Sequence, residues 1–277
     1  MRAILLGANG QLAREFINNS VNFNLQLIPF DKGMLDVTNF FELKEVIKIY
    51  MPDIVLNCAA YNHVDKAESD WEAAYKVNAL GPRNLAVLSN EHNFILVHFS
   101  SDYVFDGLSS KPYLIYDKPN PISTYGKSKL SGEKEITSLC SKYYIIRTSW
   151  VFGDGTNSFP RKLIEWSRGK RVVKIVYDQV SSPTSARYLA IKTIDIIKNL
   201  PYGIYHVTNS GYCSRYEWAK FIFDFLKIEV ELEPVKSDEF VTPAKRPSFS
   251  VLDNFPLIGD EDWKESTTNY LLSTSQL

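Results

Sequence analysis

The sequence has little cysteine and no excess of charge of either sign. Its three cysteines, Cys58, Cys140 and Cys213, lie far apart in apolar or helical surroundings. This pattern predicts reduced, buried thiols, not a disulfide framework, and it favours a cytoplasmic location. The 31 Lys and Arg residues nearly balance the 32 Asp and Glu residues. We therefore do not expect a nucleic acid or an anionic membrane as partner, because binding either one needs clustered positive charge.

Long apolar runs and metal-ligand spacings are also missing. No run approaches the roughly 18 apolar residues that a membrane-spanning helix needs, and the N-terminal apolar run meets a glycine-rich turn too early for a signal peptide. The four histidines show no spacing typical of a metal site. With 277 residues, 45% of them hydrophobic, the chain is long enough for a substantial core. These features predict a soluble globular protein without a metal.

Short apolar runs alternate with longer amphipathic segments up to about residue 150. The runs lack the polar alternation of half-solvated strands, so we expect strands buried on both faces. They are Ala3–Leu6, Leu25–Phe30, Ile54–Leu56, Phe94–Phe99 and Tyr144–Ile146. Helices are predicted over residues 10–19, 39–50, 69–91 and 124–141. This order predicts an α/β fold, a Rossmann-type doubly wound parallel sheet with ligands at the carboxyl ends of its strands.

After about residue 150 the pattern loosens. Helices are predicted over residues 157–169, 184–199 and 214–227, separated by Gly, Pro and Ser clusters, and the charged, proline-rich C-terminal stretch is predicted to be irregular. We expect residues 1–150 to form a dinucleotide-binding domain. Residues 151–277 would form mainly a smaller α/β substrate-binding region, partly interleaved with the first domain.

A glycine motif follows the first predicted strand. Gly7, Gly10 and Ala13 have the spacing G-x-x-G-x-x-A, and a helix is predicted to begin at this motif. Gly7 would permit a tight turn and Gly10 the close approach of a pyrophosphate, while the helix N-terminus would offer free N–H groups to that anion. A plain glycine-containing turn between a strand and a helix is the alternative interpretation.

Charged residues follow the second predicted strand. Asp31 lies near the distance from the glycines at which an acidic residue meets the adenosine ribose, which favours NAD. Lys32 favours NADP instead, because a cation can pair with a 2′-phosphate. Both NADPH and NADH therefore stay open. Asp36 could approach the adenine, but a helix cap near Thr38 is an equally good explanation.

A serine, a tyrosine and a lysine form a candidate catalytic set. Ser101 follows the fourth predicted strand, and Tyr125 and Lys129 are four residues apart, on one face of a predicted helix. An ammonium group beside a phenol lowers its pKa, so Tyr125 could act as a general acid while the serine hydroxyl holds a carbonyl oxygen. Y-x-x-x-K alone is a common pattern. Its combination with the glycine motif is much more specific.

These motifs, in this order, resemble the extended short-chain dehydrogenase/reductase superfamily, whose Ser/Thr–Tyr–Lys triad would fall on Ser101, Tyr125 and Lys129. Further segments, spread over the whole chain, are similar to the dTDP-4-dehydrorhamnose reductase family. They are Asn57–Tyr61, Val64–Glu68, Ser101–Gly107, Arg147–Phe152, Asp178–Gln179 with Pro183–Thr184, and Ala244–Pro247 with Ser250 and Leu252–Asp253.

The resemblance implies reduction of the 4-keto group of a dTDP-linked 6-deoxyhexose, dTDP-4-dehydro-L-rhamnose, to dTDP-L-rhamnose, an activated sugar for polysaccharide biosynthesis. It implies that Tyr125 protonates the developing alkoxide, that Lys129 holds the nicotinamide ribose and that Ser101 orients the sugar. Asp102, Trp150 and Arg246 would also contact the substrate, Arg246 through a phosphate. The implied cofactor contacts are Gly7, Gly10, Gln11, Leu12, Asp31, Asp36, Val37, Ala60, Tyr61, Asn62, Tyr125 and Lys129.

Several alternatives remain beside this interpretation. From sequence alone, Trp150 is as well explained as a core residue at a strand end. The same triad serves nucleotide-sugar epimerases and dehydratases that keep NAD tightly bound, and non-catalytic regulatory relatives exist. A dehydratase would need a glutamate beside Asp102, which the sequence lacks.

Some relatives form a magnesium-linked dimer, but Arg187 stands where a second acid would be expected beside Glu15, which argues against the metal. Monomer and homodimer both stay open.

Overall fold

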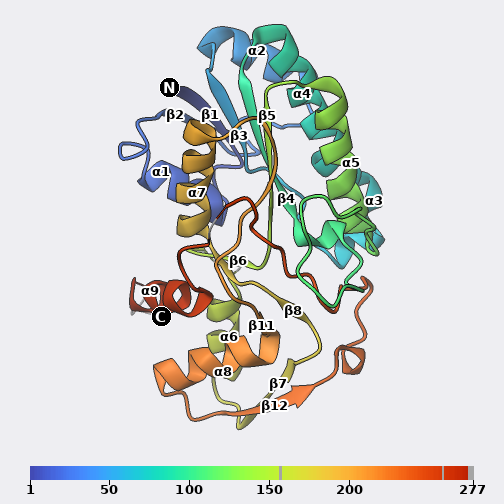
Figure 1. The fold of residues 1–277 in the computed structure, drawn as a ribbon, viewed down its shortest axis with the longest axis vertical. Helices are drawn as coiled ribbons and strands as arrows, with labels where there is room; N and C mark the ends of the chain where they lie inside the picture. Colours follow the sequence, from blue (N-terminus) through green and yellow to red (C-terminus); the bar gives the residue numbers. More distant parts are fainter. Residues whose placement is uncertain (156–157, 258, 274–277) are drawn as a thin grey trace.

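A six-stranded parallel sheet forms the centre of the computed structural model, which describes residues 1–155, 158–257 and 259–273. The strands stand in the order β10-β5-β4-β3-β1-β2 (Figure 1). Their bounds are β1 (Arg2–Leu6), β2 (Gln26–Phe30), β3 (Ile54–Asn57), β4 (Ile95–Ser101), β5 (Tyr143–Thr148) and β10 (Gly203–His206). The predicted Rossmann-type doubly wound parallel sheet is confirmed. Of these six strands, β10 was the one not expected from the sequence.

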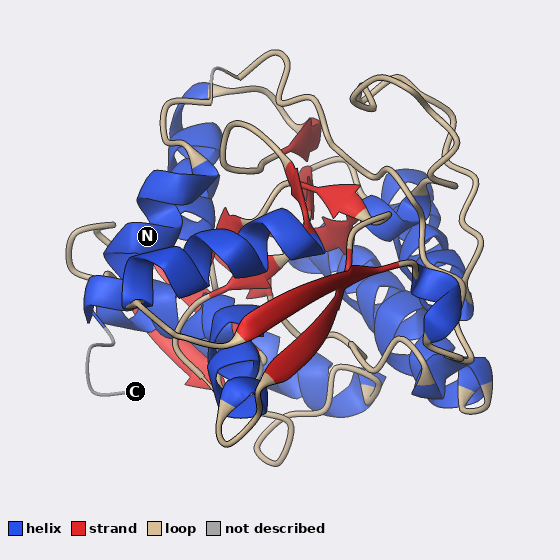
Figure 2. Cartoon of the chain, turned by 90° about the horizontal axis from the view of Figure 1, so that it is seen from below, coloured by secondary structure: helices blue, strands red, loops and turns tan. Residues whose placement is uncertain are grey.

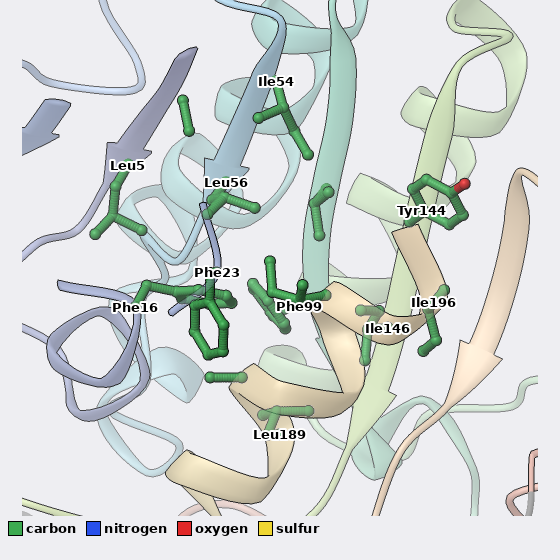
Figure 3. Close-up of a cluster of buried hydrophobic side chains, with 14 of the residues drawn as sticks. Leu5, Phe16, Phe23, Ile54, Leu56, Phe99, Tyr144, Ile146, Leu189 and Ile196 are labelled. Carbon is green, nitrogen blue, oxygen red and sulfur yellow. The ribbon is translucent and has the colours of Figure 1, made fainter. Parts of the chain in front are cut away.

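Helices cover both faces of this sheet (Figure 1). One face is covered by α1 (Gln11–Asn18) and α7 (Ala186–Asn199), the other by α2 (Phe40–Tyr50), α4 (Gly81–His92) and α5 (Thr124–Leu139). Figure 3 shows the first interface, where Phe16 of α1 and Leu189 of α7 lie beneath strand residues such as Leu56. Because both faces are covered, β3 is buried at all of its positions, which explains the apolar run Ile54–Leu56.

The helical run before β4 is interrupted by a π-helical turn. The sequence predicted one helix over residues 69–91, whereas the structure has α3 (Trp71–Tyr75), the turn η2 (Lys76–Leu80) and then α4. A Cβ on Gly132 of α5 would collide with the backbone oxygen of Asn78 in that turn. The turn therefore lies directly against α5, and π-bulges of this kind occur often at functional sites.

Side-chain caps fix where several helices begin. Asn39 accepts a hydrogen bond from a backbone N–H at the start of α2, and Ser123 and Ser185 do the same for α5 and α7. Ser214 and Glu217 form a capping box at the start of α8 (Arg215–Leu226). Short 3-10 turns lie at η1 (Lys66–Glu68), η3 (Asp102–Val104) and η4 (Ser237–Glu239).

A second, smaller core lies at the carboxyl ends of the sheet strands; Figure 2 shows the molecule from that side. Its buried members include Phe152, Trp218 and Trp263. Helices α6 (Phe159–Ser167), α8 and α9 (Trp263–Ser273) contribute to it. Short strands pair within this region: β6 (Val151–Phe152) with β9 (Thr184–Ser185), β7 (Val172–Val176) with β12 (Glu231–Val235), and β8 (Val180–Ser181) with β11 (Cys213–Ser214).

The C-terminal part differs from its prediction in one respect. The stretch expected to be irregular contains α9, which buries Trp263, Tyr270 and Leu271 against the second core. Polar residues separate these anchors, so the apolar pattern of the helix is weak. Segments beyond residue 150 also return to the main sheet, α7 on its face and β10 at its edge. The division at residue 150 stays a prediction.

The thiols and the lengths of the helices can be read directly from the structure. All three cysteines are free thiols, with Cys140 and Cys213 buried and Cys58 partly buried. None of the helices in the described part of the chain is long and apolar enough to cross a membrane.

Candidate active site

The strand order reverses between β1 and β3, the place at which a doubly wound sheet is expected to bind its ligand. Gly7 follows β1 with a φ of +78°, and a Cβ there would lie 2.8 Å from the backbone nitrogen of Ala59, after β3. Only glycine fits this close approach and this backbone conformation. Gly10 donates to the carbonyl oxygen of Gly7 at 3.0 Å, and no side chain caps the start of α1. The N–H groups at that helix end are therefore available to an anionic ligand.

The residues around this turn fit a dinucleotide. The side-chain oxygen of Gln11 is buried and has no hydrogen-bond partner among the described residues. Leu12 follows it in the first turn of α1. Asp31 accepts hydrogen bonds from the backbone of Gly33 at 2.8 Å and from the side chain of Asn9 at 3.2 Å. It thus links the end of β2 to the glycine turn, on the side where a cofactor ribose would lie.

Asp36 and Val37 shape the chain before α2. Asp36 accepts a hydrogen bond from the Thr38 backbone at 2.8 Å, which places its side chain in a turn just before the helix cap; the cap of α2 itself is Asn39. Val37 is buried, and a Cβ on Gly81 at the start of α4 would come within 2.8 Å of it. The adenosine contacts implied for both residues stay predictions.

The loop after β3 is held by Asn78, which the sequence analysis missed. The Asn78 side chain accepts from the Tyr61 backbone N–H at 2.8 Å and donates to the Tyr61 carbonyl at 3.1 Å. It also donates to the hydroxyl of Ser128 in α5 at 3.0 Å. Asn78 therefore fixes residues Ala60 to Asn62 beside α5. The sequence of this turn, Lys76–Leu80, gives no sign that distinguishes Asn78 from a surface amide.

Tyr125, Ser101 and Asn62 come together at the carboxyl end of β4. The phenol of Tyr125 donates to the Asn62 side-chain oxygen at 3.4 Å, while the Ser101 hydroxyl donates to Asp102 at 3.0 Å. Burial raises the pKa of Tyr125 well above its ordinary value, and the neighbouring Ser101 hydroxyl opposes that shift. A Cβ on Gly126 would collide with the backbone oxygen of Tyr103, so α5 approaches this site as closely as its backbone allows.

Lys129 lies one turn further along α5 and is buried. Its ammonium nitrogen donates to the backbone oxygen of Phe99 at 2.6 Å and lies 3.5 Å from Nε2 of His98. Burial lowers the pKa of Lys129 to about 8. The sequence predicted that Lys129 lowers the pKa of Tyr125. In this geometry the shift is in the opposite direction, because the ammonium is directed toward β4 and desolvation of the phenol dominates.

Asp102 is buried beneath three hydroxyl groups. It accepts hydrogen bonds from Ser101 at 3.0 Å, Ser181 at 3.3 Å and Ser250 at 2.5 Å. Burial raises the pKa of Asp102 to about 6, and these hydrogen bonds oppose the shift. Asp102 therefore joins the end of β4 to β8 and to the C-terminal segment. Its contact with substrate stays a prediction.

The sequence allowed two interpretations of Trp150, a substrate contact and a core residue at a strand end, and the structure shows features of both. It is half-buried between β5 and β6 and stacks on Trp218 of the second core at 6.0 Å between ring centroids. Its φ of +43° is a left-handed conformation that costs a non-glycine residue energy and is concentrated at functional sites. The guanidinium carbon of Arg215 lies 3.5 Å from the Trp150 ring centroid. The sequence analysis overlooked Arg215.

Arg246 is engaged by other residues of the chain. It donates to both carboxylate oxygens of Asp65, at 3.1 and 2.7 Å, and also to Thr242 and Ala244. The ion pair lowers the pKa of Asp65. Arg246 therefore ties the C-terminal segment to the loop before η1. Its predicted phosphate contact stays a prediction.

Glu15 is the acidic residue that was considered as a magnesium ligand, and Arg187 stands at the position where a second acid would be needed. The positive charge of Arg187 lowers the pKa of Glu15, while burial, the larger effect, raises it. Within residues 1–155, 158–257 and 259–273, no three His, Cys, Asp or Glu side chains are grouped as metal ligands.

Comparison with known proteins places this arrangement in one family. The chain is similar to a solved dTDP-4-dehydrorhamnose reductase from Clostridium acetobutylicum (41% identity, TM-score 0.96, all of both chains). It is also similar to the Bacillus anthracis dTDP-4-dehydrorhamnose reductase solved in complex with NADP (36% identity, TM-score 0.95, 98% of this chain and 99% of that one). The spore coat polysaccharide biosynthesis protein SpsK of Bacillus subtilis is 34% identical over 99% of this chain and 98% of its own length. The family model described as RmlD substrate binding domain matches residues 1–273, and the chain belongs to that family.

Proposed function

We propose that this protein is a reductase that uses NADPH to convert dTDP-4-dehydro-L-rhamnose into dTDP-L-rhamnose in polysaccharide biosynthesis. The observation that carries the proposal is that the glycine turn and the Ser101–Tyr125–Lys129 set lie at the same edge of one sheet. The names of the similar proteins support the reaction, and the NADP complex of the Bacillus anthracis relative supports the cofactor. NADH remains the alternative donor.

In this mechanism Tyr125 donates the proton. NADPH, when bound, supplies the hydride that the keto carbon receives. The carbonyl oxygen then takes the phenolic proton of Tyr125, and solvent restores that proton afterwards. The burial that raises the Tyr125 pKa keeps the phenol protonated at neutral pH, which is the state a proton donor requires.

The other residues of the set position the reacting groups. The Ser101 hydroxyl lies near enough to Tyr125 to affect its pKa and can share the carbonyl oxygen with it. Lys129 offers a buried cation, to which we assign the nicotinamide ribose. Gly7, Gly10, Gln11 and Leu12 are assigned to the cofactor pyrophosphate, because they form the glycine turn and the uncapped helix start.

The test is cofactor oxidation, followed by absorbance, with dTDP-4-dehydro-L-rhamnose as substrate and NADPH or NADH supplied in turn. Tyr125→Phe should keep its affinity for cofactor and lose roughly 10²–10⁴-fold in turnover, the usual effect of removing a general acid. Tyr116→Phe is the matched control, because that side chain is 76% exposed and away from the core. Equal turnover in Tyr125→Phe and the unmodified protein would remove Tyr125 from the mechanism.

The same preparation separates the reductase from an epimerase. A reductase exchanges its cofactor at every turnover, whereas an epimerase returns the hydride to the sugar and keeps NAD bound. Stoichiometric NAD that survives dialysis, without net oxidation of NADPH, would contradict the proposal. We also propose a cytoplasmic location, which the three free thiols support, and a monomer or homodimer.

A further inference from the structure

Arg215 lies beside the proposed active site, although it comes from the C-terminal core. It follows β11, which pairs with β8 so that Cys213 lies opposite Ser181. The hydroxyl of Ser181 donates to Asp102 at 3.3 Å, next to Ser101. The Arg215 guanidinium lies over the ring of Trp150. The first turn of α8 is thereby brought to the active-site edge of the sheet.

The position of Arg215 is unfavourable for a cation on three counts. It is the first residue of α8, where the helix dipole opposes positive charge. Burial lowers the pKa of Arg215 to about 10, so the attraction of the Trp150 and Phe159 rings, the latter 4.9 Å from the guanidinium carbon, does not offset the loss of hydration. Among the described residues, none accepts a hydrogen bond from the guanidinium, and no carboxylate lies within ion-pair distance. Residues that violate local rules in this way concentrate at functional sites.

The neighbouring charged groups do not compensate for this cost. Asp102 is close enough to favour the charged form of Arg215, but its oxygens already accept three serine hydroxyls. Arg246 is a second cation in the same region, and its charge lowers the pKa of Arg215. Arg246 is neutralised by Asp65, whereas Arg215 is not paired with any described carboxylate. An anionic ligand would reduce the repulsion between Arg215 and Arg246, and it would accept hydrogen bonds from the guanidinium of Arg215.

We propose that Arg215 binds the diphosphate of the nucleotide-sugar substrate, while lying over Trp150. This inference rests on the proposed function, and it adds a residue to the substrate side of the same site. The planar guanidinium has five donors, and a ligand on its open side could take two of them in the forked arrangement that phosphate oxygens accept. The contact with Trp150 fixes the plane of the fork, so less conformational entropy is lost on binding.

The location favours the substrate diphosphate over the cofactor pyrophosphate. The glycine turn that suits a cofactor pyrophosphate follows β1 and contacts Ala59. Arg215 instead contacts Trp150 and Phe159, which belong to the second core. The two anion sites are thus built from different parts of the chain, and a change at Arg215 should leave cofactor binding intact.

The experiment measures binding of dTDP and, separately, of NADPH by calorimetry to the full-length protein. Arg215→Gln should weaken dTDP binding by roughly 10- to 100-fold, the effect of losing hydrogen bonds to a charged group, and leave NADPH binding within about twofold. Arg215→Lys should bind dTDP with intermediate affinity, because it keeps the charge but loses the fork. Lys220→Gln is the control, since it removes one positive charge from an exposed position of the same helix.

Each outcome decides the matter. Equal dTDP affinity in Arg215→Gln and the unmodified protein overturns the inference, even if the protein reduces the keto sugar. Parallel weakening of dTDP and NADPH, with a lowered urea midpoint, also overturns it, because it would indicate a structural role. If the unmodified protein binds no dTDP and shows no NADPH oxidation, the proposed function fails and this inference fails with it.

Discussion

The buried ion pair between Glu133 and Arg147 allows a quantitative test of what holds the catalytic helix in place. Tyr125, Lys129 and Glu133 are spaced four residues apart on α5, so they share one face of that helix. Arg147 in β5 donates three hydrogen bonds to the Glu133 carboxylate, the shortest at 2.7 Å, and both side chains are 3% exposed. This pair therefore anchors α5 to the sheet.

Glu133→Gln removes the negative charge and leaves a buried guanidinium without its counter-ion. Breaking a buried pair in this way costs about 3–5 kcal/mol, because the remaining charge cannot be hydrated. We expect that loss in the free energy of unfolding, measured by urea denaturation at constant m-value. The matched control is Glu91→Gln, which breaks the Lys44–Glu91 pair at 2.8 Å; those side chains are 33% and 41% exposed, so the expected loss is below about 1 kcal/mol.

A double variant tests the physical reason. Glu133→Leu combined with Arg147→Met replaces both charges by apolar groups, and it should recover most of the stability lost in Glu133→Gln. If Glu133→Gln costs no more than the surface control, the pair does not anchor α5. If the double variant is less stable than Glu133→Gln, the cost does not come from an unpaired charge and the explanation is wrong.

Three further predictions concern the site itself. Because burial lowers the pKa of Lys129 to about 8, its ammonium is lost as the pH rises through that value. NADPH affinity should therefore fall between about pH 7 and 9, whereas Lys129→Met should bind weakly at every pH; a flat titration of the unmodified protein would contradict the ribose assignment. Because burial raises the pKa of Asp102 from 3.8 to about 6, the folded state favours the protonated acid, so stability should decline as the pH rises from about 4 to 6. The loss should reach about 3 kcal/mol; urea midpoints of the unmodified protein and Asp102→Asn should diverge over that window, and parallel curves would refute the shift. Gly126→Ala places a Cβ against the Tyr103 carbonyl, which should cost roughly 1–3 kcal/mol of stability and lower turnover by displacing α5. Unchanged kcat and unchanged urea midpoint in that variant would mean that the close approach is not required.

The sequence predicted the elements whose patterns are local. The β1–glycine turn–α1 unit follows from an apolar run, a glycine spacing and an amphipathic helix, all within a few residues. The face shared by Tyr125 and Lys129 follows from helical spacing alone. The parallel sheet follows from strands without polar alternation, because such strands must be covered on both faces.

Features that depend on contacts between distant segments were not predicted from the sequence. The side chain of Asn78 holds a loop 17 residues away, and no local pattern distinguishes this role from that of a surface amide. Arg215 belongs to a helix of the second core, and only the pairing of β8 with β11 brings it to the site. The direction of the Tyr125 pKa shift depends on desolvation, which spacing cannot reveal, so the prediction based on Lys129 had the wrong sign.

The hydrogen bond between Ser250 and Asp102 has a consequence for the order in which the protein is made. The two residues are 148 positions apart in the chain. At the roughly 5–20 residues per second of translation, about 7–30 s pass between the synthesis of one and of the other. During that interval the nascent chain can form the glycine turn, but it cannot complete the hydroxyl cover over Asp102. The nucleotide-binding half can therefore fold during translation, whereas the active site is completed only after the segment around Ser250 has left the ribosome.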